Sequence, residues 1–205
     1  MTLVAERIVL RRLGRVEYQS TLEAMRAWSA ARDAAAGDEL WLLEHPPVYT
    51  LGQGADARHG PERDNGIPVI RSDRGGEITY HGPGQLVLYT LVDLARRGIG
   101  VKRFVWLLEQ SVIDLLGTGE RRAGAPGVYA GGAKIASLGL RISRGRATHG
   151  IALNVCMDLA PFAAIDPCGF AGLAVTQARD LGIEGSVESL GTRLARILAG
   201  RLEDA

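Results

Sequence analysis

Residues 131–172, GGAKIASLGLRISRGRATHGIALNVCMDLAPFAAIDPCGFAG, carry the pattern that decides the fold. Two runs within this stretch, 133–143 and 147–157, have the composition of β-strands. Gly145 lies between them, at the point where a tight hairpin turn needs a glycine. After Met157 the strand pattern stops, and the prolines and glycines that follow are typical of a loop. The stretch therefore predicts a β-hairpin followed by a loop.

Both cysteines of the chain lie in this stretch, and their surroundings differ. Cys156 falls inside the second strand-like run. Free cysteine is often buried as a small hydrophobe, so we expect Cys156 to pack in the core. Cys168 stands between a proline and a glycine in the loop, where backbone can approach a substrate closely. Cys168 is the candidate nucleophile, and a loop cysteine without a catalytic role is the alternative.

Lys134 is the second candidate catalytic residue, because this chain carries nearly all of its positive charge on arginine. The 24 basic residues comprise 22 arginines and only two lysines, Lys102 and Lys134. Arginine cannot release its proton near neutral pH, whereas a desolvated lysine can act as a base or pair with a thiolate. A solvated lysine at the start of a strand is the alternative interpretation.

Composition and length exclude several classes of protein. A chain of 205 residues suffices for one domain with a full core, and we expect a single domain over residues 1–205. The net charge of +1 gives no sign of a nucleic-acid partner. No apolar run approaches the roughly 20 residues of a membrane span, and the N-terminus lacks a signal-peptide core. Without a CxxC or HExxH pattern no metal site is predicted, and we expect a cytoplasmic protein.

Strand-like runs outnumber helical ones along the chain. Apolar residues recur at helical spacing in three segments, 16–36, 101–116 and 187–202. Several neighbouring strands have connections too short for a crossover helix, which favours a largely antiparallel or mixed sheet. The sequence therefore predicts an α+β fold with helices packed on the sheet. The expected strands besides the hairpin are 7–13, 39–43, 48–52, 67–71, 85–94, 127–130 and an extended segment at 173–178.

Six separate motifs stand out along the chain. They are RGGEITYHGPGQLVLYTLVDL (74–94), LLEQSV (107–112), APGVY (125–129), KIASLGLRIS (134–143), HGIALNVCMDLAPF (149–162) and IDPCGFAGLAVTQ (165–177). In order and spacing they resemble the motifs of the octanoyltransferases of lipoate biosynthesis. The resemblance covers roughly residues 38–180 and implies the catalytic-domain fold of the biotin and lipoate protein ligases.

The resemblance also implies roles for individual residues. Cys168 and Lys134 would be catalytic, and His149 is a candidate to assist them or a satisfied core histidine. The glycine-rich stretch 74–85 matches neither glycine pattern that cradles phosphates, and we interpret it as a wall that leaves room for an acyl chain. We expect a closed apolar tunnel for eight carbons. The implied substrate contacts are Arg74, Gly75, Gly76, Glu77, Ile78, Thr79, Tyr80, His81, Ser137, Leu138, Gly139, Gly150, Ile151 and Ala152.

The implied reaction moves octanoyl from octanoyl-acyl carrier protein to a specific lysine of a lipoyl domain, the first step of endogenous protein lipoylation. Cys168 would hold the acyl group as a thioester, with Lys134 as its activator. The acceptors would be E2 subunits of 2-oxoacid dehydrogenases and the glycine cleavage H protein. No cofactor is expected, since the donor carries its own phosphopantetheine, and no ATP is required.

Acyl carrier protein and lipoyl domains are generally acidic, so we expect a rim of arginines, which a steered encounter would use. Three other functions stay open at this point. They are an ATP-dependent lipoate or biotin ligase on the same fold, a non-catalytic acyl-binding module and a cysteine hydrolase. The rim candidates are Arg71, Arg74, Arg141, Arg144 and Arg146.

Overall fold

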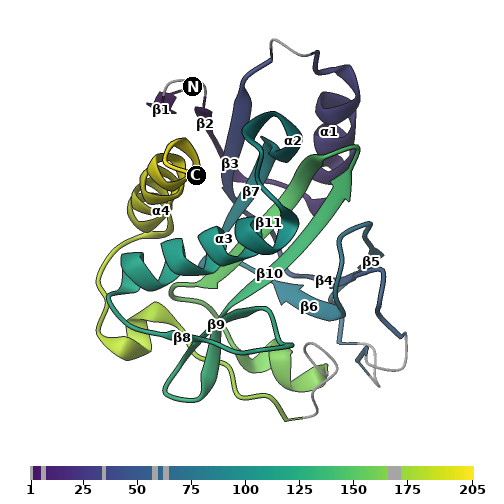
Figure 1. The fold of residues 1–205 in the computed structure, drawn as a ribbon. Coiled ribbons are helices and arrows are strands. Elements are labelled where there is room, and N and C mark those ends of the chain that lie inside the picture. The colour runs from purple at the N-terminus through teal and green to yellow at the C-terminus, as the bar shows by residue number, and fades with distance from the viewer. Residues whose placement is uncertain (1, 6–7, 34–35, 57–59, 62–64, 166–171) are drawn as a thin grey trace.

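The structure is a computed structural model, which describes residues 2–5, 8–33, 36–56, 60–61, 65–165 and 172–205. These residues form an eight-stranded sheet, a three-stranded sheet and the helices that pack beside them (Figure 1). No helix among them is long and apolar enough to cross a membrane. The helices are α1 (Tyr18–Ala31), α2 (Leu94–Arg97), α3 (Val101–Leu116) and α4 (Val187–Glu203), with the 3₁₀ turns η2 (Ala160–Ala164) and η4 (Ala178–Leu181).

The large sheet has the order β1-β2-β3-β7-β11-β10-β9-β8. Its neighbouring strands are antiparallel except for the parallel pair β2–β3. The mixed, largely antiparallel α+β architecture predicted from the sequence is confirmed. The strands are β1 (Thr2–Ala5), β2 (Ile8–Arg15), β3 (Asp38–Glu44), β7 (Gln85–Asp93), β8 (Glu120–Arg121), β9 (Gly127–Ala130), β10 (Ala133–Ser143) and β11 (Arg146–Asn154).

The small sheet has the order β5-β4-β6 and lies beside the large one (Figure 1). Strand β4 pairs parallel with β5 and antiparallel with β6. A separate hydrophobic cluster covers it, in which Tyr49 and Tyr80 meet Phe162 and Ile165. The sheet therefore joins the glycine-rich stretch to the segment that leads toward Cys168. Its strands are β4 (Val48–Leu51), β5 (Val69–Arg71) and β6 (Ile78–His81).

Helices cover both faces of the large sheet because its central strands are apolar on both sides. Successive side chains of a strand point to opposite faces. In β3, Leu40 and Leu42 therefore pack in the cluster that contains α3 and α4, whereas Trp41 and Leu43 pack in the cluster that contains α1. Every residue of β7 is buried. The sheet is thus the middle layer of the molecule.

Helix α1 and strand β11 both end earlier than the sequence predicts, and each end has a tertiary cause. Helix α1 ends at Ala31 although the helical pattern continues to residue 36. Arg32 takes an extended conformation, and its buried guanidinium donates to Asp38 at 2.9 Å and to the Leu91 carbonyl at 3.3 Å. These contacts with the sheet outweigh the local helical preference.

Cys156 is exposed, so the expectation that it packs in the core is wrong. Strand β11 ends at Asn154, because the N–H groups of Val155 and Cys156 both donate to the carbonyl of Gly84 instead of continuing the ladder. Gly84 has a φ of 85°, and a Cβ there would lie 2.0 Å from the Cys156 oxygen. Only glycine permits this close approach, which turns the chain out of the sheet.

Candidate active site

A cavity of about 50 Å³ lies where β10 and β11 meet residues 74–81 and the start of α1. It brings together most of the residues that the sequence predicted as substrate contacts. Gly75 and Tyr80 are the exceptions: the N–H of Gly75 donates to the Leu140 carbonyl at 2.8 Å, and Tyr80 packs against Phe162. The predicted residues that line the cavity are Arg74, Gly76, Glu77, Ile78, Thr79, His81, Ser137, Leu138, Gly139, His149, Gly150, Ile151 and Ala152.

The register of the hairpin explains why two separate motifs form one wall. Ser137 pairs with Ala152, and Gly139 pairs with Gly150. A Cβ at Gly139 would lie 2.9 Å from Cδ of Arg74. The glycine pair therefore leaves space above the sheet, which the Arg74 side chain partly occupies. The cavity lining combines apolar groups with arginine, glutamate and histidine side chains, and its use as the expected acyl tunnel stays a prediction.

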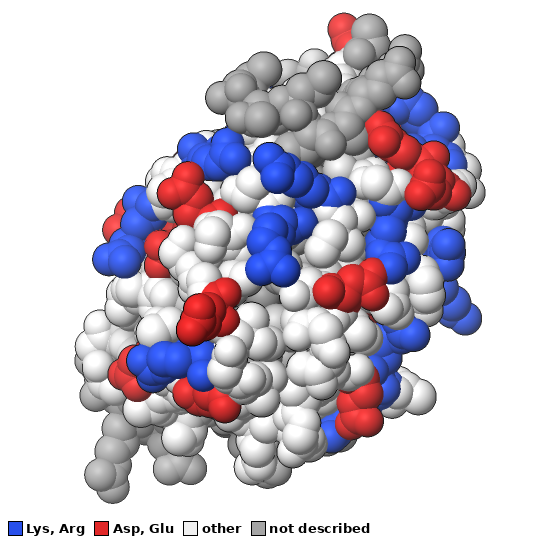
Figure 2. Space-filling model, turned by 90° about the vertical axis from the view of Figure 1, so that its left-hand side faces the viewer, with Lys and Arg blue, Asp and Glu red and all other residues white. Residues whose placement is uncertain are grey.

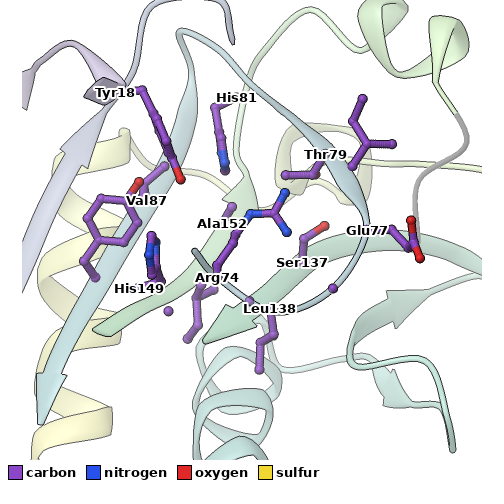
Figure 3. A pocket seen from close by; sticks show the side chains of 16 residues that line it. Tyr18, Arg74, Glu77, Thr79, His81, Val87, Ser137, Leu138, His149 and Ala152 are labelled. Carbon is purple, nitrogen blue, oxygen red and sulfur yellow. The ribbon is translucent and has the colours of Figure 1, made fainter. Parts of the chain in front are cut away.

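Arg74 is buried and does not belong to a solvated rim, which corrects that expectation. Its side chain donates to the carbonyl of Thr50 at 2.6 Å and to the Thr50 hydroxyl at 2.8 and 3.2 Å. Another guanidinium nitrogen donates to the Gly75 carbonyl at 3.0 Å. These groups of the protein replace water around the charge. In Figure 3 the guanidinium lies in the middle of the cavity, between His81 and Ser137.

Only one of the two ring nitrogens of His149 has a hydrogen-bond partner in the described residues, and the residue has an unusual backbone conformation. Its φ is 61°, uncommon for a residue with a side chain, and the Thr90 hydroxyl donates to its carbonyl at 2.9 Å. The ring Nε2 lies 2.8 Å from the Asp73 carboxylate, whereas Nδ1 is buried with no partner in the described part of the chain. Burial lowers the pKa of His149, and the hydrogen bond from His149 holds the pKa of Asp73 well below its usual range. The ring is therefore neutral, donates from Nε2 and keeps a free acceptor at Nδ1.

Tyr18, Val87 and Tyr89 complete the lining of the cavity, and the sequence offered no local sign of them. Tyr18 stacks on His81, with ring centroids 5.9 Å apart, and the Tyr89 hydroxyl lies 2.8 Å from Nε2 of His45. Burial lowers the pKa of His45 to about 4 and lowers that of His81 well below its usual value. Both imidazoles are thus neutral hydrogen-bonding groups. They come from different elements, so only the tertiary fold shows that they meet.

Lys134 is buried, which rules out the solvated strand-end interpretation. Its Nζ donates to the Pro126 carbonyl at 2.9 Å and lies 5.4 Å from the centroid of the Tyr129 ring. Its main chain accepts a hydrogen bond from Thr176 and donates one to Ala174. The segment that follows Cys168 in the sequence therefore runs directly beside Lys134.

Cys168 lies outside the described residues, so its pairing with Lys134 stays a prediction. The chain is described up to Ile165, which packs in the cluster of the small sheet, and again from Gly172. Val175 then forms a parallel bridge with Lys134. The described flanks thus connect the loop to the small sheet on one side and to β10 on the other.

Three of the predicted rim arginines gather at the turn of the β10–β11 hairpin. Arg141, Arg144 and Arg146 line a second cavity of about 360 Å³, together with Arg26 and Asp73. The second cavity adjoins the first through Asp73, whose carboxylate accepts from His149. Arg71, the remaining rim candidate, lies exposed on β5 and does not line this cavity.

Comparison with known proteins assigns the chain to a family. Residues 17–199 match the family model described as the lipoyl protein ligase A/B catalytic domain. The chain belongs to this family. An octanoyltransferase of Thiobacillus denitrificans is 60% identical over 185 residues, which cover 88% of this chain and 84% of that protein. An octanoyltransferase of Aromatoleum aromaticum is 57% identical over 195 residues, which cover 93% of this chain and 84% of that protein.

Solved structures of lipoate and biotin protein ligases share the fold. A lipoate-protein ligase A bound with ATP has a TM-score of 0.79 at 17% sequence identity, covering 97% of this chain and 86% of that one. A biotin protein ligase from Aquifex aeolicus has a TM-score of 0.57 at 13% identity, covering 96% and 69%. At such identities the likeness shows the fold alone. It confirms the biotin and lipoate ligase fold that the sequence motifs implied.

Proposed function

We propose that this enzyme transfers octanoyl from octanoyl-acyl carrier protein to a lysine of a lipoyl domain, through a thioester on Cys168. The observation that carries the proposal is the 60% identity to an octanoyltransferase over most of both chains. The buried Lys134 supports it, since its main chain is paired with the segment that follows Cys168. The described cavity would hold the acyl chain on the wall formed by β10 and β11.

In the first step the Cys168 thiolate bonds to the acyl carbon, and the bond from that carbon to the phosphopantetheine sulfur breaks. Lys134 takes the thiol proton and returns it to the departing sulfur. In the second step the amine of the lipoyl domain bonds to the same carbon, and the thioester bond of Cys168 breaks. The proton lost by the amine passes through Lys134 to the Cys168 sulfur. The thiol and an amide result.

This scheme needs neither a cofactor nor ATP, because each step exchanges one acyl bond for another. The donor brings its own phosphopantetheine, and the acceptors would be lipoyl domains of 2-oxoacid dehydrogenase E2 subunits and the glycine cleavage H protein. The rival function is an ATP-dependent ligase, since a lipoate-protein ligase of the same fold has been solved with ATP. A ligase would form an acyl-adenylate and would not need the cysteine.

The test is the intact mass of the protein after incubation with octanoyl-acyl carrier protein in the absence of ATP. We expect an octanoyl adduct on the wild type and on Cys156→Ser, the matched control at the other cysteine. We expect none on Cys168→Ser, and the transfer rate of that variant should fall by roughly 10³-fold or more. An adduct that persists in Cys168→Ser, or transfer that requires ATP, would contradict the proposal.

A further inference from the structure

The peptide group between Pro126 and Gly127 bridges Lys134 to a buried carboxylate. Its carbonyl accepts from Nζ of Lys134 at 2.9 Å, and its N–H donates to Oε1 of Glu109 at 2.9 Å. The amine of Lys134 thus lies at one end of a single amide and the Glu109 side chain at the other. Hydrogen bonds in such a chain polarise one another, so each contact strengthens the other.

Glu109 lies where an ionisable side chain is costly. It projects from the face of α3 that also buries Phe104, Leu108 and Val112, and only 7% of its surface is exposed. Burial raises the pKa of Glu109, while the Gly127 N–H, Arg121 and Lys134 act in the opposite direction. A buried carboxylate is tolerated when it is hydrogen-bonded and faces positive charge. Among the described residues, Glu109 meets these conditions through the Gly127 N–H, Arg121 and Lys134.

Gly127 allows the lysine to lie directly against this peptide. Its φ is 137°, and a Cβ there would lie 2.6 Å from Cε of Lys134 and 2.6 Å from the Ala136 oxygen. Any side chain at this position would displace the lysine from the Pro126 carbonyl. The 126–127 peptide, the absence of a side chain at Gly127 and the Glu109 carboxylate therefore act together to hold Lys134 in place.

We propose that Glu109 is a positioning residue for Lys134, because it fixes the 126–127 peptide that receives Nζ. The inference rests on the proposed function of Lys134 as the activator of Cys168. Through it, the structure links a helix on one face of the sheet to the chemistry at the start of β10.

Two further side chains near Lys134 in the described residues come from β9 and from the turn that follows β8. Nζ of Lys134 lies 5.4 Å from the centroid of the Tyr129 ring, and the Arg122 guanidinium lies 4.2 Å from the same centroid. Arg122 also pairs with Glu120 at 3.3 Å.

The experiment measures the rate of octanoyl-adduct formation at saturating donor, together with KM for octanoyl-acyl carrier protein. Glu109→Gln keeps an acceptor oxygen and the size of the side chain but removes the charge, which weakens the hydrogen bond from the Gly127 N–H. We expect the rate to fall roughly 10- to 100-fold, because a small misplacement of a reacting group is costly. KM should stay at the wild-type value, because Glu109 does not line the described cavity. The matched control is Glu188→Gln, a carboxylate on α4 whose side chain is 75% exposed, for which we expect the wild-type rate and KM.

Failure of the inference and failure of the proposed function give different results. If the wild type forms no adduct on Cys168, the proposed function itself is wrong. If the wild type reacts and Glu109→Gln matches its rate, the positioning role is overturned. Glu109→Asp keeps the charge on a shorter arm and serves if the glutamine variant does not fold. A slower rate of Glu109→Asp with the wild-type KM and thermal midpoint supports the proposal, and an unchanged rate contradicts it.

Discussion

Lys134 and His149 are buried in neighbouring strands but lie far apart along the site. Leu140, which pairs with His149, is six residues from Lys134 along β10. At 3.3 Å per residue this separation is about 20 Å. A group at that distance cannot exchange a proton directly with Lys134. The structure therefore favours a place for His149 at the distal wall of the cavity over the assisting role considered from the sequence.

His45 should make the stability of the fold sensitive to mild acid. Burial lowers its pKa to about 4, below the ordinary value of about 6.5. The unfolded chain therefore takes up a proton at a higher pH than the folded chain. The contribution of His45 to the free energy of unfolding is therefore complete above about pH 6.5 and is lost as the pH falls toward 4. From His45 alone we expect the free energy of unfolding to fall by about 2 kcal/mol between about pH 7.5 and pH 5, measured by urea denaturation.

The variant His45→Gln isolates this effect, because glutamine is neutral throughout the range. Its free energy of unfolding should depend less on pH than that of the wild type. His81, whose pKa burial also lowers, contributes in the same direction and stays present in both proteins. The same pH dependence in wild type and variant would show that His45 does not titrate as its burial requires.

Helix α4 contains a matched pair of glycines that separates packing from helix propensity. A Cβ at Gly191 would lie 2.3 Å from Cδ1 of the buried Leu42, whereas nothing lies within 4 Å of a Cβ at Gly200. We expect Gly191→Ala to destabilise the protein by about 1–3 kcal/mol through overpacking against β3. Gly200→Ala should stabilise it by about 0.5–1 kcal/mol, because alanine is the better helix former.

Thermal and urea denaturation of the two variants measure this difference. Equal effects of both substitutions would mean that α4 does not pack against β3 as closely as the structure shows. The comparison is informative because both changes add the same methyl group to the same helix. Only the neighbouring side chain differs.

Elements with a strong local pattern could be predicted from the sequence, and those fixed by distant contacts could not. The bounds of α3, β9 and β10 agree with the periodic apolar residues and the glycines that flank them. The end of α1 depends on the contact of Arg32 with Asp38, which no local pattern encodes. The parallel pairing of β2 with β3 likewise depends on α1 connecting them across the sheet.

The candidate site shows the same division. The sequence motifs predicted Lys134 and the cavity wall at residues 137–139 and 150–152, because these residues lie in two consecutive strands. The sequence did not predict Asp73 or Tyr18. Asp73 contacts His149, and Tyr18 contacts His81, only in the tertiary fold. Glu109 did leave a signal, a single carboxylate within the apolar stripe of α3.

Charge is unevenly distributed over the whole molecule although its net value is only +1. The side on which α4 lies shows acidic and basic side chains interspersed, without one dominant patch (Figure 2). At the hairpin turn, in contrast, Arg141 and Arg144 share the second cavity with Arg26 and Arg146. The latter two pair with Asp73 and Asp93, whereas Arg141 and Arg144 have no carboxylate partner in the described part of the chain. The hairpin turn is therefore a site of uncompensated positive charge among the described residues.

This charge should speed the encounter with an acidic acyl carrier protein, and the effect should weaken with salt. We expect kcat/KM for Arg144→Glu to be roughly two- to tenfold below that of the wild type at low ionic strength. The two proteins should converge as salt is added, since the Debye length is about 8 Å at physiological ionic strength. Arg193→Glu changes an exposed arginine on α4 by the same charge and should leave kcat/KM unchanged.

Because the turn lies about 30 Å along β10 from Lys134, Arg144→Glu acts on association and not on chemistry. The rate of adduct formation at saturating donor should therefore be the same in Arg144→Glu and in the wild type. A slower rate in the variant would refute steering by this surface. So would a wild-type kcat/KM that does not change with salt concentration.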